Sequence, residues 1–181
     1  MIIVCGRPGS GKTTLAGVLS RELRCPLISR DVLKEGYINT TEKGHAFITP
    51  EENVGIYNLF FATIELLLDN KITTIAESAF QHKLWSPKYE NLSKKADIKI
   101  IICKIDNLLA NRRFLDRKKN DPFRESFHGD DPDFITDEHY IYNPPGFQVP
   151  AMEVDTTGEY KPALSEIVSF LRGGKNKSGK I

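Results

Sequence analysis

The chain has 181 residues, of which 40% are hydrophobic and 27% charged. This size and composition are typical of one compact domain with a real core. A formal net charge of +1 excludes a broad electrostatic attraction to nucleic acid or to membranes. No apolar run approaches the ~20 residues that span a bilayer, and the N-terminus lacks the pattern of a signal peptide.

Cysteine usage favours a reducing compartment. The chain has three cysteines, Cys5, Cys25 and Cys103, which cannot all pair with one another. The sequence contains neither a C-x-x-C pair nor another metal-ligand spacing. We therefore expect unpaired thiols in a cytoplasmic protein.

Apolar runs typical of strands alternate with helical patterns along the chain. The expected strands cover residues 1–5, 27–29, 72–76, 98–105 and 152–154. The expected helices cover residues 12–24, a brief segment from 31 onward, 50 to 67 or 68, 85–96, 107–119 and 162–171. This alternation predicts an α/β fold whose parallel sheet is covered on both faces, in a single domain over residues 1–172.

The start of the third helix has a specific signal. Residues 38–50 are polar and rich in turn-forming residues, so we expect a loop there. The loop ends where Thr49, Pro50 and Glu52 have the spacing of a capping box with proline in the first turn. A helix should therefore begin at Pro50.

Two later segments are expected to be irregular. Residues 120–150 are polar and proline-rich, and we interpret them as an insertion or lid over the same core. We expect the lid region to cover about 112–146. Residues 173–181 are rich in glycine and lysine, and we expect a flexible basic tail.

Residues 6–13, GRPGSGKT, fit the pattern G-x-x-x-x-G-K-[S/T] in full and lie between an apolar strand and an amphipathic helix. Glycines let backbone N–H groups converge on phosphates, and the helix N-terminus adds positive charge. Lys12 would reach the β- and γ-phosphates, and the hydroxyl of Thr13 would bind Mg²⁺. The expected nucleotide-binding residues of this loop are Gly6, Pro8, Gly9, Ser10, Gly11, Lys12, Thr13 and Thr14.

Missing motifs narrow the class of nucleotide-binding protein. The sequence has no N-K-x-D stretch for reading guanine, and no long strand ends in the Asp-Glu pair typical of hydrolytic ATPases. A small chain with an arginine-rich helix late in the sequence favours phosphoryl transfer to a small acceptor.

Five segments come in the order found in small P-loop kinases: GRPGSGKTTLAGVL, ISRDVLK, TTIAESAF, NRRFLDR and VDTTG. The chain resembles the predicted-kinase group with AAA-type domains, which includes polynucleotide 5′-kinases, zeta-toxin-like kinases and chloramphenicol phosphotransferase. This resemblance implies a three-layer P-loop NTPase fold with a five-stranded parallel sheet in the order 2-3-1-4-5. It also implies ATP as the donor and a hydroxyl acceptor.

Two carboxylates follow predicted strands and should meet the phosphate loop at one edge of the sheet. The similar kinases hold the base for the acceptor hydroxyl at the position of Asp31, where Arg30 would keep it ionised. The alternative is that Asp31 caps a helix starting at Val32. Glu77 would orient the substrate or hold Mg²⁺ through water, or else be an exposed charge at a strand end. Asp106 is expected to cap the next helix.

Arg113 and Arg117 lie four residues apart, on one face of the arginine-rich helix. In the similar kinases such a pair neutralises the transferring phosphoryl group or binds ATP. The alternative is a solvated basic face with Asp116 as a partner. Asp155 and Thr156 follow the last strand, where the resemblance implies backbone contacts to adenine; a simple turn is the alternative.

The acceptor is expected to bind residues from 34–60 and 78–90. The candidates are Lys34, Tyr37, His45, Tyr57, Phe60, Phe61, Phe80, Gln81, His82 and Trp85. Most of them are expected in the core or at its rim, and we assign substrate binding to Lys34 together with Asp31 and Glu77. Surface lysines between 83 and 95 would suit a nucleic-acid end, but a solvated face is favoured, and no protein partner is inferred.

The sequence therefore predicts an ATP- and Mg²⁺-dependent kinase that phosphorylates a hydroxyl of a small-molecule or nucleotide-type acceptor. Two alternatives stay open. One is a polynucleotide 5′-hydroxyl kinase or a zeta-toxin-like nucleotide-sugar kinase. The other is a nucleotide-binding switch that hydrolyses its nucleotide slowly or not at all.

Overall fold

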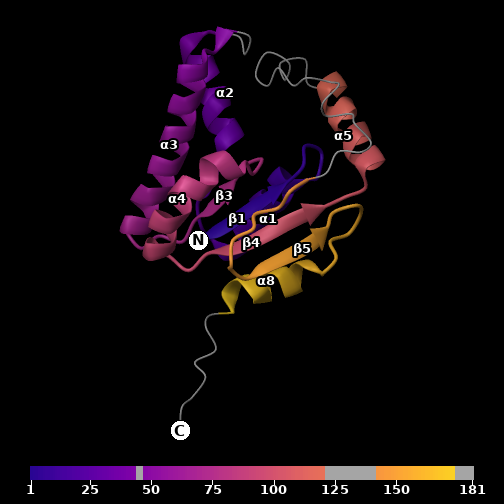
Figure 1. Ribbon diagram of the computed structural model, residues 1–181. Helices are drawn as coiled ribbons and strands as arrows, with labels where there is room; N and C mark the ends of the chain where they lie inside the picture. The colour runs from indigo at the N-terminus through magenta and orange to yellow at the C-terminus, as the bar shows by residue number, and fades with distance from the viewer. Residues whose placement is uncertain (44–46, 121–141, 174–181) are drawn as a thin grey trace.

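A computed structural model of the chain describes residues 1–43, 47–120 and 142–173 (Figure 1). Its strands are β1 (Ile2–Gly6), β2 (Leu27–Ser29), β3 (Ile75–Glu77), β4 (Lys99–Lys104) and β5 (Ala151–Asp155). They form one parallel sheet in the order β2-β3-β1-β4-β5, which confirms the predicted fold and strand order. The helices are α1 (Lys12–Leu23), α2 (Arg30–Thr41), α3 (Pro50–Asp69), α4 (His82–Lys95), α5 (Asn107–Asn120) and α8 (Leu164–Arg172).

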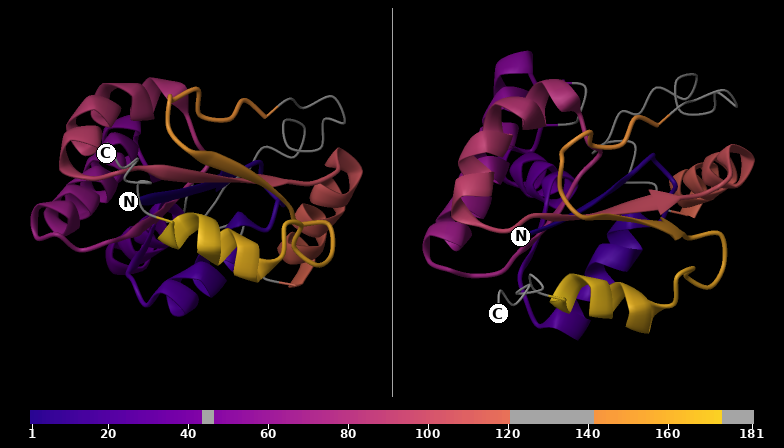
Figure 2. Two further views of the ribbon diagram at one scale, coloured as in Figure 1. Left: turned by 90° about the horizontal axis from the view of Figure 1, so that it is seen from below. Right: turned by 60° about the horizontal axis from the view of Figure 1, so that its bottom comes forward.

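Helices cover both faces of the sheet (Figure 2). Strand β1 is buried along its whole length, and its side chains alternate between the two faces. Ile3 and Cys5 pack with the residues of α3 and α4, whereas Ile2 and Val4 pack with α1 and α8. A continuous apolar run is what a central parallel strand between two helix layers requires.

The layer formed by α3 and α4 is rich in aromatic side chains. The rings of Phe60, Phe61 and Trp85 meet edge to face, with centroids 5.1 to 5.9 Å apart. Farther along the chain, Phe147 stacks on Tyr89 with centroids 3.9 Å apart. The segment that leads into β5 therefore packs against this layer of helices.

Several predicted boundaries are wrong: α4 begins at His82 rather than at residue 85, and α8 at Leu164 rather than at residue 162. Two further differences have local reasons. The strand predicted at 72–76 begins at Ile75, because the N–H of Ile72 donates to Leu67 and ends helix α3. The brief helix expected after Asp31 continues to Thr41, because buried Ile38 anchors its second half. The loop expected at 38–50 therefore starts later.

The predicted capping box of α3 is confirmed. The Thr49 hydroxyl accepts the N–H of Glu52 at 3.2 Å, and the Glu52 carboxylate accepts the N–H of Thr49 at 2.9 Å. The other oxygen of Glu52 accepts hydrogen bonds from Lys43 and Tyr37, both at 2.6 Å. These two donors lower the pKa of Glu52 to about 2, and the bond from Tyr37 ties α2 to α3.

Parts of the predicted lid and tail, residues 121–141 and 174–181, lie outside the described residues. Within the described ranges, none of the helices combines the length and the apolar composition that a bilayer crossing requires.

Replacing Thr49 with alanine tests the capping box. We expect Thr49→Ala to lower the free energy of unfolding by about 1 kcal/mol, because the first turn of α3 loses its side-chain acceptor. Denaturant unfolding followed by circular dichroism measures the change. Thr63→Ala is the matched control, since this mid-helix hydroxyl bonds only a carbonyl of its own helix among the described residues. Equal losses in both variants would contradict a special contribution from the cap.

Candidate active site

The phosphate loop connects β1 to α1 and packs closely against α5. Gly9 has a φ of 79°, and a Cβ atom there would lie 2.2 Å from the carbonyl oxygen of Ala110. Only glycine suits both this conformation and this contact. Gly11 stands at the N-cap of α1 with a φ of 77° and offers no side-chain cap. The first N–H groups of α1 are thus available to an anion, where the helix dipole favours negative charge.

Glu77 lies behind the phosphate loop and has no exposed surface. Its carboxylate accepts hydrogen bonds from Thr13 at 3.2 Å and from Ser29 at 2.6 Å. The ammonium of Lys12 lies 3.8 Å away. Glu77 is therefore not the exposed strand-end charge considered above, but a buried acid held by the phosphate loop and by β2.

Thr13 and Glu77 suit a magnesium ion. A hydroxyl beside a carboxylate provides the hard oxygen ligands that Mg²⁺ prefers, and this ion usually takes its remaining ligands from phosphates and water. The part of the chain that the structure describes holds no cluster of three or more His, Cys, Asp or Glu side chains suited to a metal. A metal at this pair would therefore depend on a bound nucleotide.

Asp31 lies in the first turn of α2 and does not cap it. The helix begins at Arg30, with Ser29 at the N-cap and no hydrogen bond from the cap side chain. The proposed capping by Asp31 before Val32 is wrong, because the helix starts two residues earlier. The carboxylate of Asp31 is 35% exposed and lies 3.3 Å from the guanidinium of Arg30.

Asp31 shares a cavity with the phosphate loop. This α2 cavity has a volume of about 160 Å³, and its lining includes Lys12, Thr13, Arg30, Asp31, Lys34 and Arg117. Pro8 of the phosphate loop also contributes to it. The structure thus brings the expected base, the P-loop lysine and one lid arginine to the same space.

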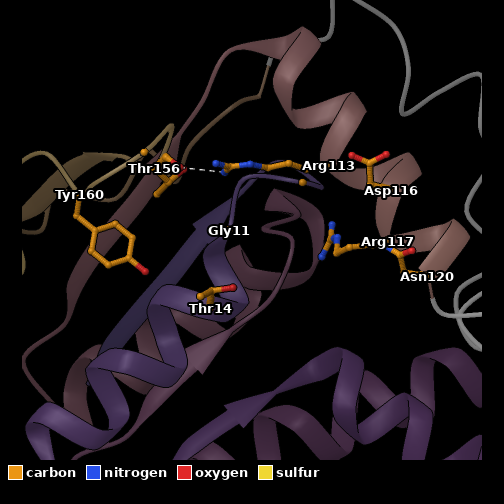
Figure 3. A pocket seen from close by; sticks show the side chains of 10 residues that line it. Gly11, Thr14, Arg113, Asp116, Arg117, Asn120, Thr156 and Tyr160 are labelled. Atoms are coloured by element: carbon orange, nitrogen blue, oxygen red, sulfur yellow. Dashed lines mark hydrogen bonds between the residues drawn. The ribbon is translucent and has the colours of Figure 1, made fainter.

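A second cavity, of about 450 Å³, lies between the phosphate loop, α5 and the loop after β5 (Figure 3). The lining of this α5 cavity includes Gly9, Gly11, Thr14, Arg113, Thr156 and Tyr160. Arg117 lines both cavities. Arg117 therefore lies between the two cavities, and residues of the phosphate loop line each of them.

The two lid arginines have different surroundings. Arg113 donates to the carbonyl oxygens of Thr156 at 2.9 Å and Thr157 at 2.7 Å. Figure 3 shows Arg117 directed into the space between α5 and α1. The alternative ion pair with Asp116 belongs instead to the exposed Arg112, at 3.9 Å. Arg113 thus holds the loop after β5, whereas Arg117 lines both cavities.

The loop after β5 contributes Thr156 rather than Asp155 to the α5 cavity. The carboxylate of Asp155 accepts the N–H of Thr157 at 2.8 Å, and hydrogen bonds from Thr157 lower the pKa of Asp155. Asp155 therefore builds its own turn. The hydroxyl of Thr156 lies 2.6 Å from the carbonyl oxygen of Ser10 and 2.9 Å from that of Lys104, which joins this turn to the phosphate loop.

Arg7 was not singled out in the sequence. Only 4% of it is exposed, and its guanidinium donates to the side-chain oxygens of Asn107 and of Asn111, the latter at 2.8 Å. Asn107 and Asn111, four residues apart on a helix, give no local signal that their partner Arg7 lies about 100 residues upstream.

The predicted cap of α5 is confirmed, because Asp106 accepts the N–H groups of residues 108–109 at 2.9 and 3.1 Å.

Of the aromatic and polar acceptor candidates, only some reach the α2 cavity. Lys34, Tyr57 and Gln81 line it. Phe60, Phe61, Phe80 and Trp85 are in the core, as expected for most candidates. Tyr37 bonds Glu52, His82 is exposed, and His45 lies outside the described residues.

Thiol chemistry has no place in this site. Burial raises the pKa of Cys5 to about 11 and that of Cys103 to about 12. Both thiols are therefore protonated at neutral pH and are poor nucleophiles. All three cysteines are free, as predicted.

The chain is similar to known proteins in both sequence and structure. A family model described as an AAA domain matches residues 1–130. No curated protein matches the chain in sequence.

Solved kinases share its fold. A putative kinase from Chloroflexus aurantiacus is 24% identical with a TM-score of 0.80, and the match covers 94% of this chain and 96% of that one. A gluconokinase from Sinorhizobium meliloti is 15% identical with a TM-score of 0.58, covering 94% and 90%. The APS kinase of Mycobacterium tuberculosis, solved with AMPPNP and APS, is 15% identical with a TM-score of 0.62, covering 95% and 97%. These matches establish a P-loop kinase fold over nearly the whole chain.

Replacing Glu77 with glutamine tests whether this carboxylate supports a metal. We expect Glu77→Gln to weaken the binding of Mg²⁺-nucleotide by about 10–100-fold, the usual effect of losing a residue that supports a metal. Nucleotide binding in EDTA should change much less. Calorimetric titration with and without Mg²⁺ measures both affinities.

Ser29→Ala is the matched control for this experiment. It removes one hydrogen bond to the same carboxylate but keeps its charge, so the Mg²⁺ dependence should persist. If Glu77→Gln retains the full Mg²⁺ dependence, the carboxylate is not part of the metal site.

Proposed function

Because the chain belongs to the AAA-domain family and has a P-loop kinase fold, we propose that it is an ATP-dependent kinase of a small hydroxylated molecule. One observation carries the proposal. Asp31 lines the same cavity as Lys12 and Thr13 of the phosphate loop. A switch that only binds nucleotide transfers no phosphoryl group, so it needs no base for an acceptor hydroxyl in this cavity.

Each of the two cavities would bind a different substrate. The larger α5 cavity would take the nucleoside part of ATP, with Arg113 and Thr156 shaping the wall beside it. Lys12 and the first N–H groups of α1 would bind the β- and γ-phosphates. The smaller α2 cavity would then hold the acceptor on the other side of the γ-phosphate.

Phosphoryl transfer needs positioning and charge neutralisation more than covalent chemistry. The acceptor oxygen attacks the γ-phosphorus, the bond from this phosphorus to the β–γ bridging oxygen breaks, and ADP leaves. Asp31 accepts the proton of the hydroxyl, and Arg117 faces the charge that spreads over the γ-phosphoryl oxygens. Thr13 and Glu77 would hold Mg²⁺, which neutralises phosphate charge when bound.

The size of the α2 cavity favours a small acceptor. Its volume of about 160 Å³ is below the range typical of pockets for drug-sized ligands. Two of the similar structures are named for small acceptors, as a gluconokinase and as an APS kinase. Lys94 and Lys95, candidates for a nucleic-acid channel, are instead paired with Glu90 and Asp69. Free cysteines fit a reducing compartment, and we retain the cytoplasm as the expected location.

An acceptor screen tests the activity. We expect a hydroxylated small molecule to raise ADP release from Mg²⁺-ATP well above the water background, because an oriented hydroxyl outcompetes water. The library should contain sugars, sugar acids, nucleosides, antibiotics, nucleotide sugars and 5′-hydroxyl oligonucleotides. A response to oligonucleotides or nucleotide sugars alone would favour the alternative kinases, and no response to any member would favour a switch.

The variant Asp31→Asn tests the base. We expect kcat with the best acceptor to fall by about 10²–10⁴-fold, the contribution typical of a general base. ATP affinity should stay close to that of the wild type, because Asp31 faces the acceptor side. Steady-state kinetics and nucleotide titration separate the two quantities.

Glu51→Gln is the matched control for Asp31→Asn. Both acids occupy the second residue of a helix, in α3 and α2 respectively, so both changes remove the same favourable interaction with a helix dipole. Similar kcat values for the two variants would reject Asp31 as the base.

A further inference from the structure

We propose that Thr156 is a positioning residue of the phosphate loop. Its hydroxyl fixes the peptide between Ser10 and Gly11, so that the N–H of Gly11 is directed to the phosphates of a bound nucleotide. The inference rests on the nucleotide binding that the proposed function requires, but not on the acceptor. It assigns a role in phosphate binding to a side chain that lies outside the motif of the loop, in the turn after β5.

The hydroxyl of Thr156 donates to the carbonyl oxygen of Ser10. These two oxygens are 2.6 Å apart, and both residues are buried, with 4% of Thr156 and none of Ser10 exposed. The carbonyl oxygen of Lys104 lies 2.9 Å from the same hydroxyl, but it already accepts the backbone N–H of Thr156 at 3.0 Å. A hydroxyl has one proton, so the carbonyl of Ser10, at the shorter distance, is the acceptor.

The direction of the Ser10 carbonyl determines the direction of the next N–H group. A peptide unit is planar, and in the trans form its C=O and N–H point in opposite directions. The peptide between Ser10 and Gly11 is trans. Because its carbonyl is directed to Thr156, the N–H of Gly11 is directed away from the turn after β5. There it joins the first N–H groups of α1 as a donor to an anion.

Gly11 does not fix this peptide by itself. Its φ is 77°, and glycine adopts positive and negative φ about equally readily. A rotation that reverses the peptide would therefore meet no side chain at Gly11. The reversed peptide would direct the carbonyl oxygen of Ser10, which carries partial negative charge, toward the phosphates and would remove one donor. The hydrogen bond from Thr156 opposes this rotation, because a buried carbonyl that loses its donor is costly.

Thr156 is itself held in place by the surrounding structure. Arg113 of α5 donates to two carbonyl oxygens of the turn, one of them that of Thr156 (Figure 3). The backbones of Asp155 and Lys161 exchange two hydrogen bonds, at 2.8 and 3.2 Å, which close the turn. A Cβ atom at Gly11 would lie 3.8 to 4.0 Å from atoms of Thr156 and Arg113. The turn is therefore well ordered and in contact with the phosphate loop.

Two variants of Thr156 test the inference by calorimetric titration with Mg²⁺-ADP, which needs no acceptor. Thr156→Val keeps the shape of the side chain and removes the hydroxyl. We expect it to weaken ADP binding by at least about tenfold, the effect of losing one hydrogen bond to a charged group. Thr156→Ser keeps the hydroxyl and should bind ADP nearly as tightly as the wild type.

Thr74→Val is the matched control. The hydroxyl of this buried threonine donates to the carbonyl oxygen of Pro26 at 3.2 Å, just before β3 and so at the edge of the sheet opposite the phosphate loop. The control also removes a hydrogen bond to another segment, but it should leave ADP affinity unchanged. Thermal unfolding checks that each variant is folded. If Thr156→Val is not, Thr156→Ala carries the same expectation, because it lacks the hydroxyl and adds no bulk.

The amide proton of Gly11 gives a readout that a change in stability alone would not produce. A proton donated to a phosphate oxygen is deshielded. In wild-type protein with isotope-labelled glycine, the Gly11 amide resonance should therefore move downfield when Mg²⁺-ADP binds. In Thr156→Val saturated with ADP this shift should be lost or much reduced, whereas Thr156→Ser should show it.

The outcomes separate this inference from the proposed function. Equal ADP affinity in Thr156→Val and the wild type, or a Gly11 resonance that ADP does not move, would overturn the role of Thr156 and leave the kinase standing. Weaker binding that Thr156→Ser does not restore, or that Thr74→Val shows equally, would overturn it too. A wild-type protein that does not bind Mg²⁺-ADP would overturn the phosphate loop as a nucleotide site, and both proposals with it.

Discussion

The buried carboxylate of Glu77 is the constraint on which the site depends. A charge without exposed surface is tolerated only where hydrogen bonds and an opposite charge surround it. Those partners come from separate segments: Ser29 ends β2 and stands opposite Glu77 in the strand register, while Lys12 and Thr13 begin α1. The carboxyl ends of β2 and β3 and the phosphate loop are thus held together by one side chain, and the α2 cavity opens beside them.

Much of the fold could be predicted from the sequence because the signals were local. The capping box before α3, the apolar β1 run and the cap at Asp106 each lie within a few residues of what they determine. The strand at Ile75 was misplaced because its limits depend on pairing with β1, whereas the N–H of the apolar Ile72 bonds back to the end of α3. Apolarity alone does not distinguish these two roles.

The residues of the site could be predicted only where a sequence motif specifies them. The glycines and Lys12 of the phosphate loop follow from their spacing, and Asp31 from its place after a strand. The burial of Glu77 could not be predicted in this way, because its partner Ser29 lies 48 residues away in the chain. The different surroundings of Arg113 and Arg117 were equally hidden, since helical spacing places both on one face while the carbonyls that bind Arg113 come from the loop after β5.

Helix α5 touches the rest of the protein at three points that lie within about one turn. The carbonyl of Ala110 meets Gly9, the side chain of Asn111 accepts from Arg7, and Arg113 binds the turn after β5. Each residue of an α-helix is rotated by about 100° from the one before it, so all three contacts hold in a single rotational phase. An insertion or deletion of one residue between 107 and 113 would swing Arg117 away from both cavities. The length of this short stretch is therefore part of the site's geometry, as much as the identity of any residue in it.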